Sequence, residues 1–351
     1  MQGNDPLYLQ MRAYLLELIE RNRQVPFYRL PSENQLAMKF GASRISAKHA
    51  LDMLRDEGLI CRQQGRGSYI APIPAEDAAQ APNREAMALI VPFTRTIFMS
   101  DLMDGLREAL NEQSLDLVTF VTDNDQEQEM TYLRQAQERF KGILLFPCTL
   151  ARYHEEVLRL VLNRFPLVQI DRYLPGLNLS CVSCDHKMAT YRAVKFLREK
   201  GHRRIGFVGH MKDHASSVAL RLKGFDLATQ ETDPGYPQSF KLNVADTLDG
   251  FADAFAAYMQ AMRPTAIISS SHLHAPAIIA VLRQLGMDRQ VQLMLYDNEF
   301  QIARDFLAYP LFIIDQQPHL IGRAAAGLVN RLAFQGGQPE NILVPEKIIA
   351  L

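Results

Sequence analysis

The chain has 351 residues, of which 48% are hydrophobic, 22% charged and 9% aromatic. That apolar share can fill one or more cores, which excludes a disordered chain, and the length favours two or three domains. No run of about 18 apolar residues occurs, and the first residues lack the basic and then apolar pattern of a signal peptide. We therefore expect a soluble, cytoplasmic protein that does not contact a membrane.

The net charge of −1 averages over two unlike parts of the chain. Residues 1–75 carry 10 Lys and Arg against 7 Asp and Glu, a net charge of +3, and the remaining residues carry 28 against 32, a net charge of −4. A small basic part on an acidic body is typical of a DNA-binding module joined to a second function. The segment 72–84 holds three prolines and is expected to be an exposed linker between a head, 1–71, and a body, 85–351.

The head begins with three expected helices. Apolar residues recur at helical spacing over residues 7–19. Ser32 begins the second helix and forms a capping box with Gln35, and Gly41 ends that helix. Ser43 caps the third helix after a short turn, as in a helix-turn-helix, where the second helix of the pair enters the major groove of DNA.

Two short strand-like runs follow the third helix. They are Leu59–Gln63 and Ser68–Ala71, and they flank the sequence Gln64-Gly65-Arg66-Gly67. The glycines allow a tight hairpin with an arginine at its tip, which is free to enter a minor groove. Three helices and a hairpin together predict a winged helix-turn-helix domain.

The start of the third helix carries the residues best suited to DNA. Arg44 can contact a guanine edge with two hydrogen bonds, while serine hydroxyls and Lys48 favour phosphates. The alternative for any one of these residues is a solvated helix face or an ordinary charged turn, but the whole arrangement favours DNA. The DNA-binding residues that we expect are Ser32, Ser43, Arg44, Ser46, Lys48, Gly65, Arg66 and Gly67.

A series of short motifs runs through nearly all of residues 5–71: Pro6–Tyr8, Leu30–Glu33, Gly41–Arg44, Ala50–Leu51, Glu57–Ile60 and Gln64–Ser68. Together they resemble the DNA-binding domain of the GntR family. The resemblance implies a homodimer on a palindromic operator, with Arg44 in the major groove and the wing tip in the minor groove. Where the family usually has Thr-Thr-Val-Arg-Glu, this chain has Ile45-Ser46-Ala47-Lys48-His49, so the family's base preference is not carried over.

The body alternates between short apolar runs and amphipathic stretches of helical length. This alternation predicts mostly parallel sheets with helices on both faces, and seven or more such units exceed one six-stranded sheet. We therefore expect an α/β body of two doubly wound lobes, with ligands bound beyond the carboxyl ends of the strands. The expected strands are Met87–Val91, Leu117–Val121, Gly142–Phe146, Leu167–Ile170, Ile205–Val208, Ala266–Ser269 and Val291–Tyr296, and the clearest helices are Asp101–Gln113, Tyr191–Lys200 and Ala275–Gly286.

A second series of motifs runs through the body: Phe98 with Gly105, Ile170–Arg172, Gly201–Gly209, Arg221–Phe225, Arg263–Ala266, Tyr296–Asn298 and Gln316–Pro318 before Gly322. These motifs resemble the effector-binding core of the LacI/GalR family, which is similar to periplasmic sugar-binding proteins. The resemblance implies two lobes joined by crossing strands, with a ligand between them. The lobes are expected at about 85–183 with 315–337 and at about 184–314 with 338–351. A GntR head on such a core resembles the arabinose-repressor subgroup, whose members mostly sense sugars.

The effector-binding residues that the resemblance implies are Phe98, Asp171, Arg221, Asp297 and Gln316. An aromatic face covers the apolar side of a sugar ring, while guanidinium, carboxylate and amide groups bind its hydroxyls. The structural alternatives are a core position for Phe98, a helix cap for Asp297 and a helix surface for Arg221. Where the family commonly has Asn-Asp, this chain has Ser271-His272, so His272 joins the expected site and a ligand with an acid or phosphate group fits the pattern.

Other patterns favour no catalytic or metal chemistry. Cys181 and Cys184 form a C-x-x-C, but without a second pair we favour small buried thiols over zinc or redox chemistry. The closely spaced histidine pairs lack a carboxylate or cysteine at ligand spacing, so we expect no metal. The sequence contains no nucleophile elbow, phosphate loop or dinucleotide fingerprint, and we expect no catalytic residue and no cofactor.

The sequence thus predicts a ligand-responsive, DNA-binding transcription regulator, a repressor of carbohydrate-utilisation genes. Its affinity for an operator would change when a sugar or sugar-derived effector binds between the lobes. One rival is an enzyme that acts on a sugar or sugar phosphate and has a helical, partner-binding head. Another is a ligand-binding module whose head contacts protein, and the basic helix start weighs against it.

Overall fold

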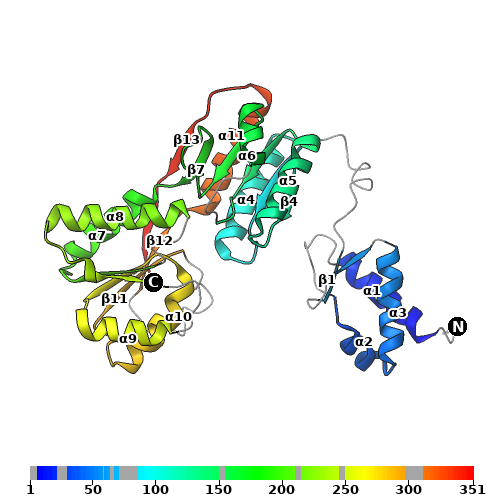
Figure 1. Cartoon of the computed structure of the whole chain (residues 1–351), viewed down its shortest axis with the longest axis horizontal. Helices are drawn as coiled ribbons and strands as arrows, with labels where there is room; N and C mark the ends of the chain where they lie inside the picture. Colours follow the sequence, from blue (N-terminus) through cyan, green and yellow to red (C-terminus); the bar gives the residue numbers. More distant parts are fainter. Residues whose placement is uncertain are drawn as a thin grey trace. The chain divides into compact units, whose positions relative to one another are not determined.

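The computed structural model describes residues 6–21, 30–57, 59–63, 67–70, 85–149, 155–209, 215–244, 250–297 and 311–351. The chain divides into two compact units, Met1–Asn83 and Arg84–Leu351 (Figure 1). The expected linker at 72–84 and the wing-tip residues Gly65 and Arg66 lie outside the described residues.

The first unit, the head, has the elements of a winged helix-turn-helix. They are α1 (Leu7–Arg21), α2 (Glu33–Phe40), α3 (Arg44–Asp56), β1 (Ile60–Gln63) and β2 (Gly67–Ile70). The two strands pair antiparallel, from Ile60 opposite Ile70 to Gln63 opposite Gly67. The predicted fold of the head is confirmed.

The caps of α2 and α3 form where the sequence predicts them. The Ser32 side chain accepts a hydrogen bond from the backbone of Gln35, and the Gln35 side chain accepts one from the backbone of Ser32, at 2.9 Å. Gly41 then takes a left-handed backbone with φ of 59°, which ends α2 and lets the chain turn. The Ser43 hydroxyl accepts from the backbone of Ser46 at 3.1 Å and starts α3.

A small aliphatic core holds the head together. All three helices contribute to it, and each of its larger members (Leu, Ile or Met) is worth about 1.5–3 kcal/mol when fully buried. Arg12 of α1 adds an ion pair of 2.8 Å with Glu57 at the end of α3. The most buried core side chains, 0–1% exposed, are Met11, Leu15, Leu36, Ala47, Ala50, Leu51 and Leu54.

The second unit, the body, contains two six-stranded sheets. The first sheet has the order β13-β7-β6-β5-β3-β4, and all its neighbouring strands are parallel. Its central strands are buried along their whole length, as a parallel sheet covered on both faces requires. Its strands are β3 (Ala86–Val91), β4 (Asp116–Val121), β5 (Gly142–Leu145), β6 (Leu167–Ile170), β7 (Ser180–Cys184) and β13 (Asn341–Val344), and the helices of this lobe are α4 (Ile97–Glu112), α5 (Gln126–Arg139), α6 (Glu155–Leu162) and α11 (Pro318–Phe334).

The second sheet has the order β14-β12-β11-β10-β8-β9. Its neighbours are parallel except for β12 and β14, which run antiparallel. Its core consists of aliphatic and aromatic side chains that are almost fully buried. Its strands are β8 (Ile205–Gly209), β9 (Lys241–Asn243), β10 (Ala266–Ser269), β11 (Gln292–Tyr296), β12 (Leu311–Asp315) and β14 (Lys347–Ala350), and the helices of this lobe are α7 (His186–Glu199), α8 (Ser216–Thr232), α9 (Phe251–Met262) and α10 (Ala275–Gln284).

The chain passes between the two lobes three times (Figure 1). It crosses after β7, after β12 and between β13 and β14. The sequence had placed residues 338–351 together in the second lobe, and that boundary is wrong. Residues 341–344 pair with β7 of the first sheet, so the last crossing falls after Val344, where β13 ends.

Two glycines fix the return of the chain to the first lobe. A Cβ at Gly105 of α4 would lie 2.1 Å from the backbone oxygen of His319, and a Cβ at Gly322 of α11 would lie 2.2 Å from that of Leu102. Both positions therefore allow α4 and α11 to approach more closely than any side chain would permit. This contact holds α11 in the first lobe although its sequence follows a strand of the second.

The predicted α/β class with two doubly wound parallel sheets is confirmed, and among the residues that it describes the structure adds five strands to those expected from the sequence. They are β7, β9, β12, β13 and β14. Among the helices that the structure describes, none combines the length and the apolar composition that a bilayer crossing requires.

Candidate functional sites

In the head, the serines expected to bind DNA already serve as helix caps. Ser32 caps α2 and Ser43 caps α3. The hydroxyls of Ser43 and Ser46 also lie 2.9 Å apart, within hydrogen-bonding distance. These hydroxyls are therefore partly committed to holding the start of α3, which limits what they can offer to a base edge.

Arg44 is the most exposed charged group at the start of α3. Its side chain is 72% exposed, and its Nε donates to a carboxylate oxygen of Glu33 on α2 at 2.8 Å. That contact uses one edge of the guanidinium and leaves the two terminal nitrogens for an acceptor pair, such as O6 and N7 of guanine. Lys48 is exposed one turn further along α3, and Gly67 begins β2.

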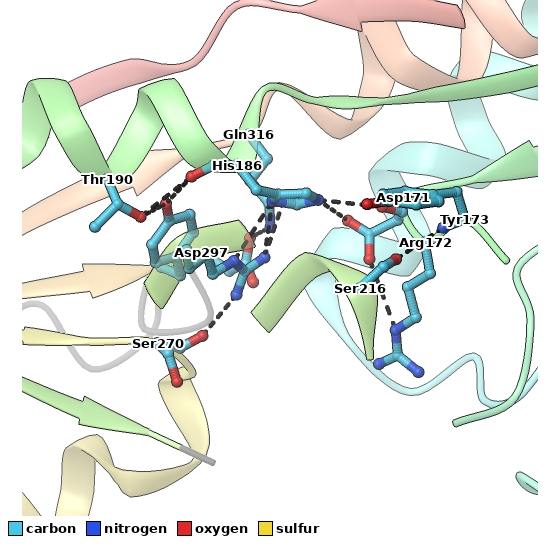
Figure 2. A network of polar contacts seen from close by, with 11 residues as sticks. Asp171, Arg172, Tyr173, His186, Thr190, Ser216, Ser270, Asp297 and Gln316 are labelled. Carbon is cyan, nitrogen blue, oxygen red and sulfur yellow. Dashed lines mark hydrogen bonds and ion pairs between the residues drawn. The ribbon is translucent and has the colours of Figure 1, made fainter. Parts of the chain in front are cut away.

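In the body, hydrogen bonds join three of the expected effector residues, Arg221, Gln316 and Asp297, and Figure 2 labels the last two. Arg221 lies on α8 and is only 6% exposed, so its alternative interpretation as a helix-surface residue is wrong. It donates to the backbone oxygen of Ser270 at 2.6 Å and to the side-chain oxygen of Gln316 at 3.2 Å. The Gln316 amide nitrogen in turn donates to Asp297.

The ring of Tyr296 completes the surroundings of this guanidinium. The guanidinium carbon Cζ of Arg221 lies 3.8 Å from the centroid of the Tyr296 ring, a close cation–π contact. The Tyr296 hydroxyl lies 2.6 Å from that of Thr190 and is fully buried, and burial raises its pKa. Arg221 is thus held from several sides and has little freedom to move away from its partners.

His186, the first residue of α7, connects this group to Asp171 (Figure 2). The guanidinium of Arg221 faces Nδ1 of the His186 ring at 3.4 Å. Nε2 lies 3.3 Å from the Asp171 carboxylate and 3.1 Å from its backbone oxygen. The ring therefore bridges a strand end of the first lobe and a helix of the second.

The Asp171 carboxyl stays ionised in this setting. Burial raises its pKa, but the interaction with His186 and the positive charges of Arg221 and Arg172 outweigh burial and lower the pKa to about 2. The side chain is 5% exposed. Asp171 is therefore a buried carboxylate that keeps its charge through its cationic and hydrogen-bonding neighbours.

The two expected carboxylates occupy equivalent places in the two lobes. Asp171 follows β6 and Asp297 follows β11, and both have a left-handed backbone, with φ of 62° and 67°. The backbone N–H of each donates to the next strand, to Val182 at 3.0 Å and to Ile314 at 3.2 Å. Both thus lie at the carboxyl ends of parallel strands, the edge at which such sheets bind ligands.

Phe98 lies in an aromatic group of the first lobe. Its ring is 9% exposed and stands edge-on to Phe146, at 6.4 Å between centroids. The ring of Phe146 also has Phe93 at 5.9 Å and the guanidinium of Arg172 at 5.0 Å. Phe98 is therefore mainly a packing residue here, and Arg172, which follows Asp171 directly, lies over the ring of its neighbour Phe146.

His272 is half-buried at the start of a 3₁₀ turn, His272–His274, two residues beyond Ser270. The structure thus joins Asp171, Arg221, Asp297 and Gln316 in one network. Phe98 packs in the aromatic group of the first lobe, and His272 lies in the 3₁₀ turn. Sequence reasoning missed His186, Arg172 and Tyr296. Tyr296 ends β11 and Arg172 lies two residues beyond the end of β6, and this position at a strand end is the signal that could have found both.

Two family models match the chain. The model for bacterial regulatory proteins of the gntR family matches residues 7–70, and that of a periplasmic binding protein-like domain matches residues 194–350. The chain is a DNA-binding transcription regulator. It combines a gntR-type head with a periplasmic-binding-protein-like body, as the motifs of the sequence predict.

Several known proteins are similar to this regulator. It is similar to the arabinose metabolism transcriptional repressor of Geobacillus stearothermophilus, 26% identical over 292 residues, which covers 80% of this chain and 79% of the relative. The ribose operon repressor of Haemophilus influenzae is 26% identical over 246 residues, 69% of this chain and 72% of that one. A solved structure of a putative ribose operon repressor from Burkholderia thailandensis has a TM-score of 0.65 at 23% identity and covers 76% of this chain and 99% of its own, which shows the fold of the body.

The cysteines of the regulator fit small buried thiols. Cys181 and Cys184 lie on β7, and both are buried and free. Burial raises the pKa of both thiols, that of Cys181 to about 12, so neither is a thiolate near neutral pH. Within the described ranges no three His, Cys, Asp or Glu side chains come close enough to hold a metal ion.

Proposed function

We propose that this regulator represses carbohydrate-utilisation genes in the cytoplasm and is released from its operator by a sugar or sugar-derived effector. The observation that carries the proposal is the buried network of Arg221, Gln316 and Asp297 at the strand ends of a two-lobed body. Charged and amide groups of this kind bind hydroxyls by charge-assisted hydrogen bonds. The names of the arabinose and ribose repressors to which the chain is similar support a sugar as the effector class.

On the DNA side, the head would bind one half-site of a palindromic operator as part of a homodimer. Arg44 would read a guanine in the major groove, and Lys48 would contact a phosphate. Ser32 would cap α2, and Ser43, paired with Ser46, would position the start of α3. Gly65, Arg66 and Gly67 would form the wing. Two-fold symmetry of the protein would then be mirrored in the operator.

On the effector side, the ligand would bind where the two lobes are bridged by His186. The Gln316 amide donates a hydrogen bond to Asp297, and either side chain could exchange this bond for one to a ligand hydroxyl. Asp171 and Arg172 would contribute from the first lobe, with His272 from the second and Phe98 at the apolar side of the ring. A ligand that prefers one arrangement of the lobes would shift the body between two states and thereby change DNA affinity by about 5–150-fold.

The proposal assigns no catalytic activity. The similar proteins compared above are repressors, and the buried network would serve binding. Its charged groups are already paired with one another, whereas a general acid or base must be able to exchange a proton with a substrate.

A thermal-shift screen of the full chain against sugars and sugar phosphates tests this function. A ligand at about 100 times its dissociation constant stabilises the body by about 2.7 kcal/mol, and the same ligand should then release a selected operator in a mobility-shift titration. The Asp297→Ala variant should lose the thermal response and keep DNA binding. Asp253→Ala, an exposed carboxylate on α9 of the same lobe, serves as the matched control and should respond like the unmodified chain.

The outcomes separate the parts of the proposal. If no carbohydrate stabilises the chain while operator binding persists, the effector class is wrong. If Asp297→Ala responds to the ligand as strongly as Asp253→Ala does, the assigned site is wrong.

A further inference from the structure

The start of α3 exposes one large aliphatic side chain, that of Ile45. It is 79% exposed, whereas the other apolar side chains on α3 that form the core, such as Ala47 and Leu51, are 0–1% exposed. A β-branched residue on an exposed helix position costs helix stability relative to alanine and contributes nothing to the core. The fold of the head therefore gives no reason for an isoleucine at this position.

The neighbours of Ile45 are those of a nucleic-acid surface. Arg44 directly precedes it, Lys48 is exposed one turn later, and the first turn of α3 contains no acidic residue. The positive end of the helix dipole adds to these cations. Ile45 is thus an aliphatic side chain surrounded by groups that attract an anion, which argues against an apolar protein partner on this face.

The hydroxyls of the serines beside Ile45 are already hydrogen-bonded within the head, which leaves fewer side chains to contact a base. Ser43 accepts the backbone hydrogen bond that caps α3, and its hydroxyl pairs with that of Ser46. Arg44 and Ile45 are then the two exposed side chains of this first turn that remain available to contact a base. Arg44 uses only its Nε, in the hydrogen bond to Glu33. Arg44 is suited to guanine, and the side chain of Ile45 has no polar group at all.

The major groove presents one apolar group to such a side chain, the C5-methyl of thymine. We infer that Ile45 is a specificity-determining residue that packs against a thymine methyl next to the base contacted by Arg44. This inference rests on the proposed function, because it requires α3 to enter the major groove. It also explains why an isoleucine stands where the family usually has a threonine, because the aliphatic side chain would contact an apolar group of the DNA.

The size of the effect follows from the area that a methyl group buries. Removing one methyl-sized group from an apolar contact costs about 0.8 kcal/mol, which corresponds to about fourfold in affinity. A symmetric dimer would lose this factor once in each half-site, or about 16-fold for the whole operator. Both changes are large enough to measure in a direct binding titration.

The experiment uses the full chain. Operators are first enriched from a random duplex pool by binding, and each thymine of the enriched sequence is then replaced singly by deoxyuridine, which removes only the methyl group. The inference expects one position per half-site at which deoxyuridine lowers affinity about fourfold. Ile45→Ala changes both protomers of the dimer, so it should lower affinity for the thymine duplex by about 16-fold and should bind the thymine and deoxyuridine duplexes equally.

Met38→Ala is the matched control, because Met38 of α2 is 82% exposed and also aliphatic. It should keep the full difference between thymine and deoxyuridine. If the chain binds an operator but no deoxyuridine replacement matters, or if Ile45→Ala keeps the difference, the role of Ile45 is overturned while the proposed function stands. If the chain enriches no sequence and binds no duplex, the proposed function and this inference both fail.

Discussion

The charge of Asp171 offers a quantitative test of the network that joins the two lobes. Its pKa is lowered from 3.8 to about 2, against the effect of burial, by His186, Arg221 and Arg172. At 1.36 kcal/mol per pKa unit, the ionised carboxylate contributes about 2 kcal/mol to the stability of the body. Because the pKa is lower in the folded state, this contribution is fully present above the unfolded value near pH 4. It is lost as the pH falls through the folded value near pH 2.

Asp171→Asn removes this charge while keeping the shape of the side chain, and asparagine tolerates the φ of 62°. We expect the unfolding free energy of the body to fall by about 2 kcal/mol at pH 7, a decrease in Tm of about 4–8 °C. The gap between the variant and the unmodified chain should shrink to about half at pH 3, because the unmodified carboxylate then protonates on unfolding.

Calorimetry of the full chain measures this difference. The sequence has no Trp whose fluorescence could report unfolding, and calorimetry can resolve separate transitions of the two compact units. Asp123→Asn is the matched control, since Asp123 has a φ of 52° but is exposed, and it should leave Tm nearly unchanged. A gap between the unmodified chain and Asp171→Asn that is the same at pH 7 and pH 3 would refute the reasoning.

Three further perturbations test other parts of the molecule. Gly322→Ala places a Cβ 2.2 Å from a backbone oxygen of α4 and should destabilise the body by about 1–3 kcal/mol in a urea titration. Gly327→Ala on the same helix meets nothing within 4 Å and should be neutral or stabilise by about 0.5–1 kcal/mol, so equal effects of the two would contradict the close approach of α4 and α11. Leu51→Ala should cost the head about 2–5 kcal/mol and abolish operator binding while the ligand-induced thermal shift of the body remains. Glu33→Ala removes the carboxylate that positions Arg44, so the ratio of operator affinity to non-specific affinity should fall. Non-specific affinity should not decrease, because a negative charge near the DNA is also lost. An unchanged ratio would show that Glu33 does not position Arg44.

Local signals in the sequence account well for the head. Its caps at Ser32, Ser43 and Gly41 depend on contacts between residues at most a few positions apart, and such contacts can be read from the chain directly. In the body, most of the strands that the sequence predicted are buried apolar runs, and β4, which is only partly buried, is the exception. Sequence reasoning missed β7, whose sequence Ser-Cys-Val-Ser-Cys is fully buried but has few apolar side chains, and β13, which is mostly exposed at the edge of its sheet.

The order of crossings was beyond sequence reasoning for a related reason. The assignment of β13 depends on its pairing with β7, about 160 positions earlier in the chain. An apolar run reports that a strand is buried and does not report which sheet it joins. The same limit applies to α11, whose place in the first lobe is set by the close approach of Gly322 to α4.

The polar network around Arg221 shows what position along a strand can predict and what it cannot. Asp171 and Asp297 were expected from the family resemblance, and their place after strands of parallel sheets agrees with it, because ligands bind at that edge. His186 could not be predicted, because its role depends on bringing Asp171 and Arg221 to opposite sides of one ring across two lobes. Buried ion pairs of this kind seldom stabilise a fold more than apolar side chains of the same volume would. A body selected for stability alone would have little use for a buried guanidinium and carboxylate bridged by an imidazole, and their presence at the ligand-binding edge of both sheets is therefore an argument for a polar ligand.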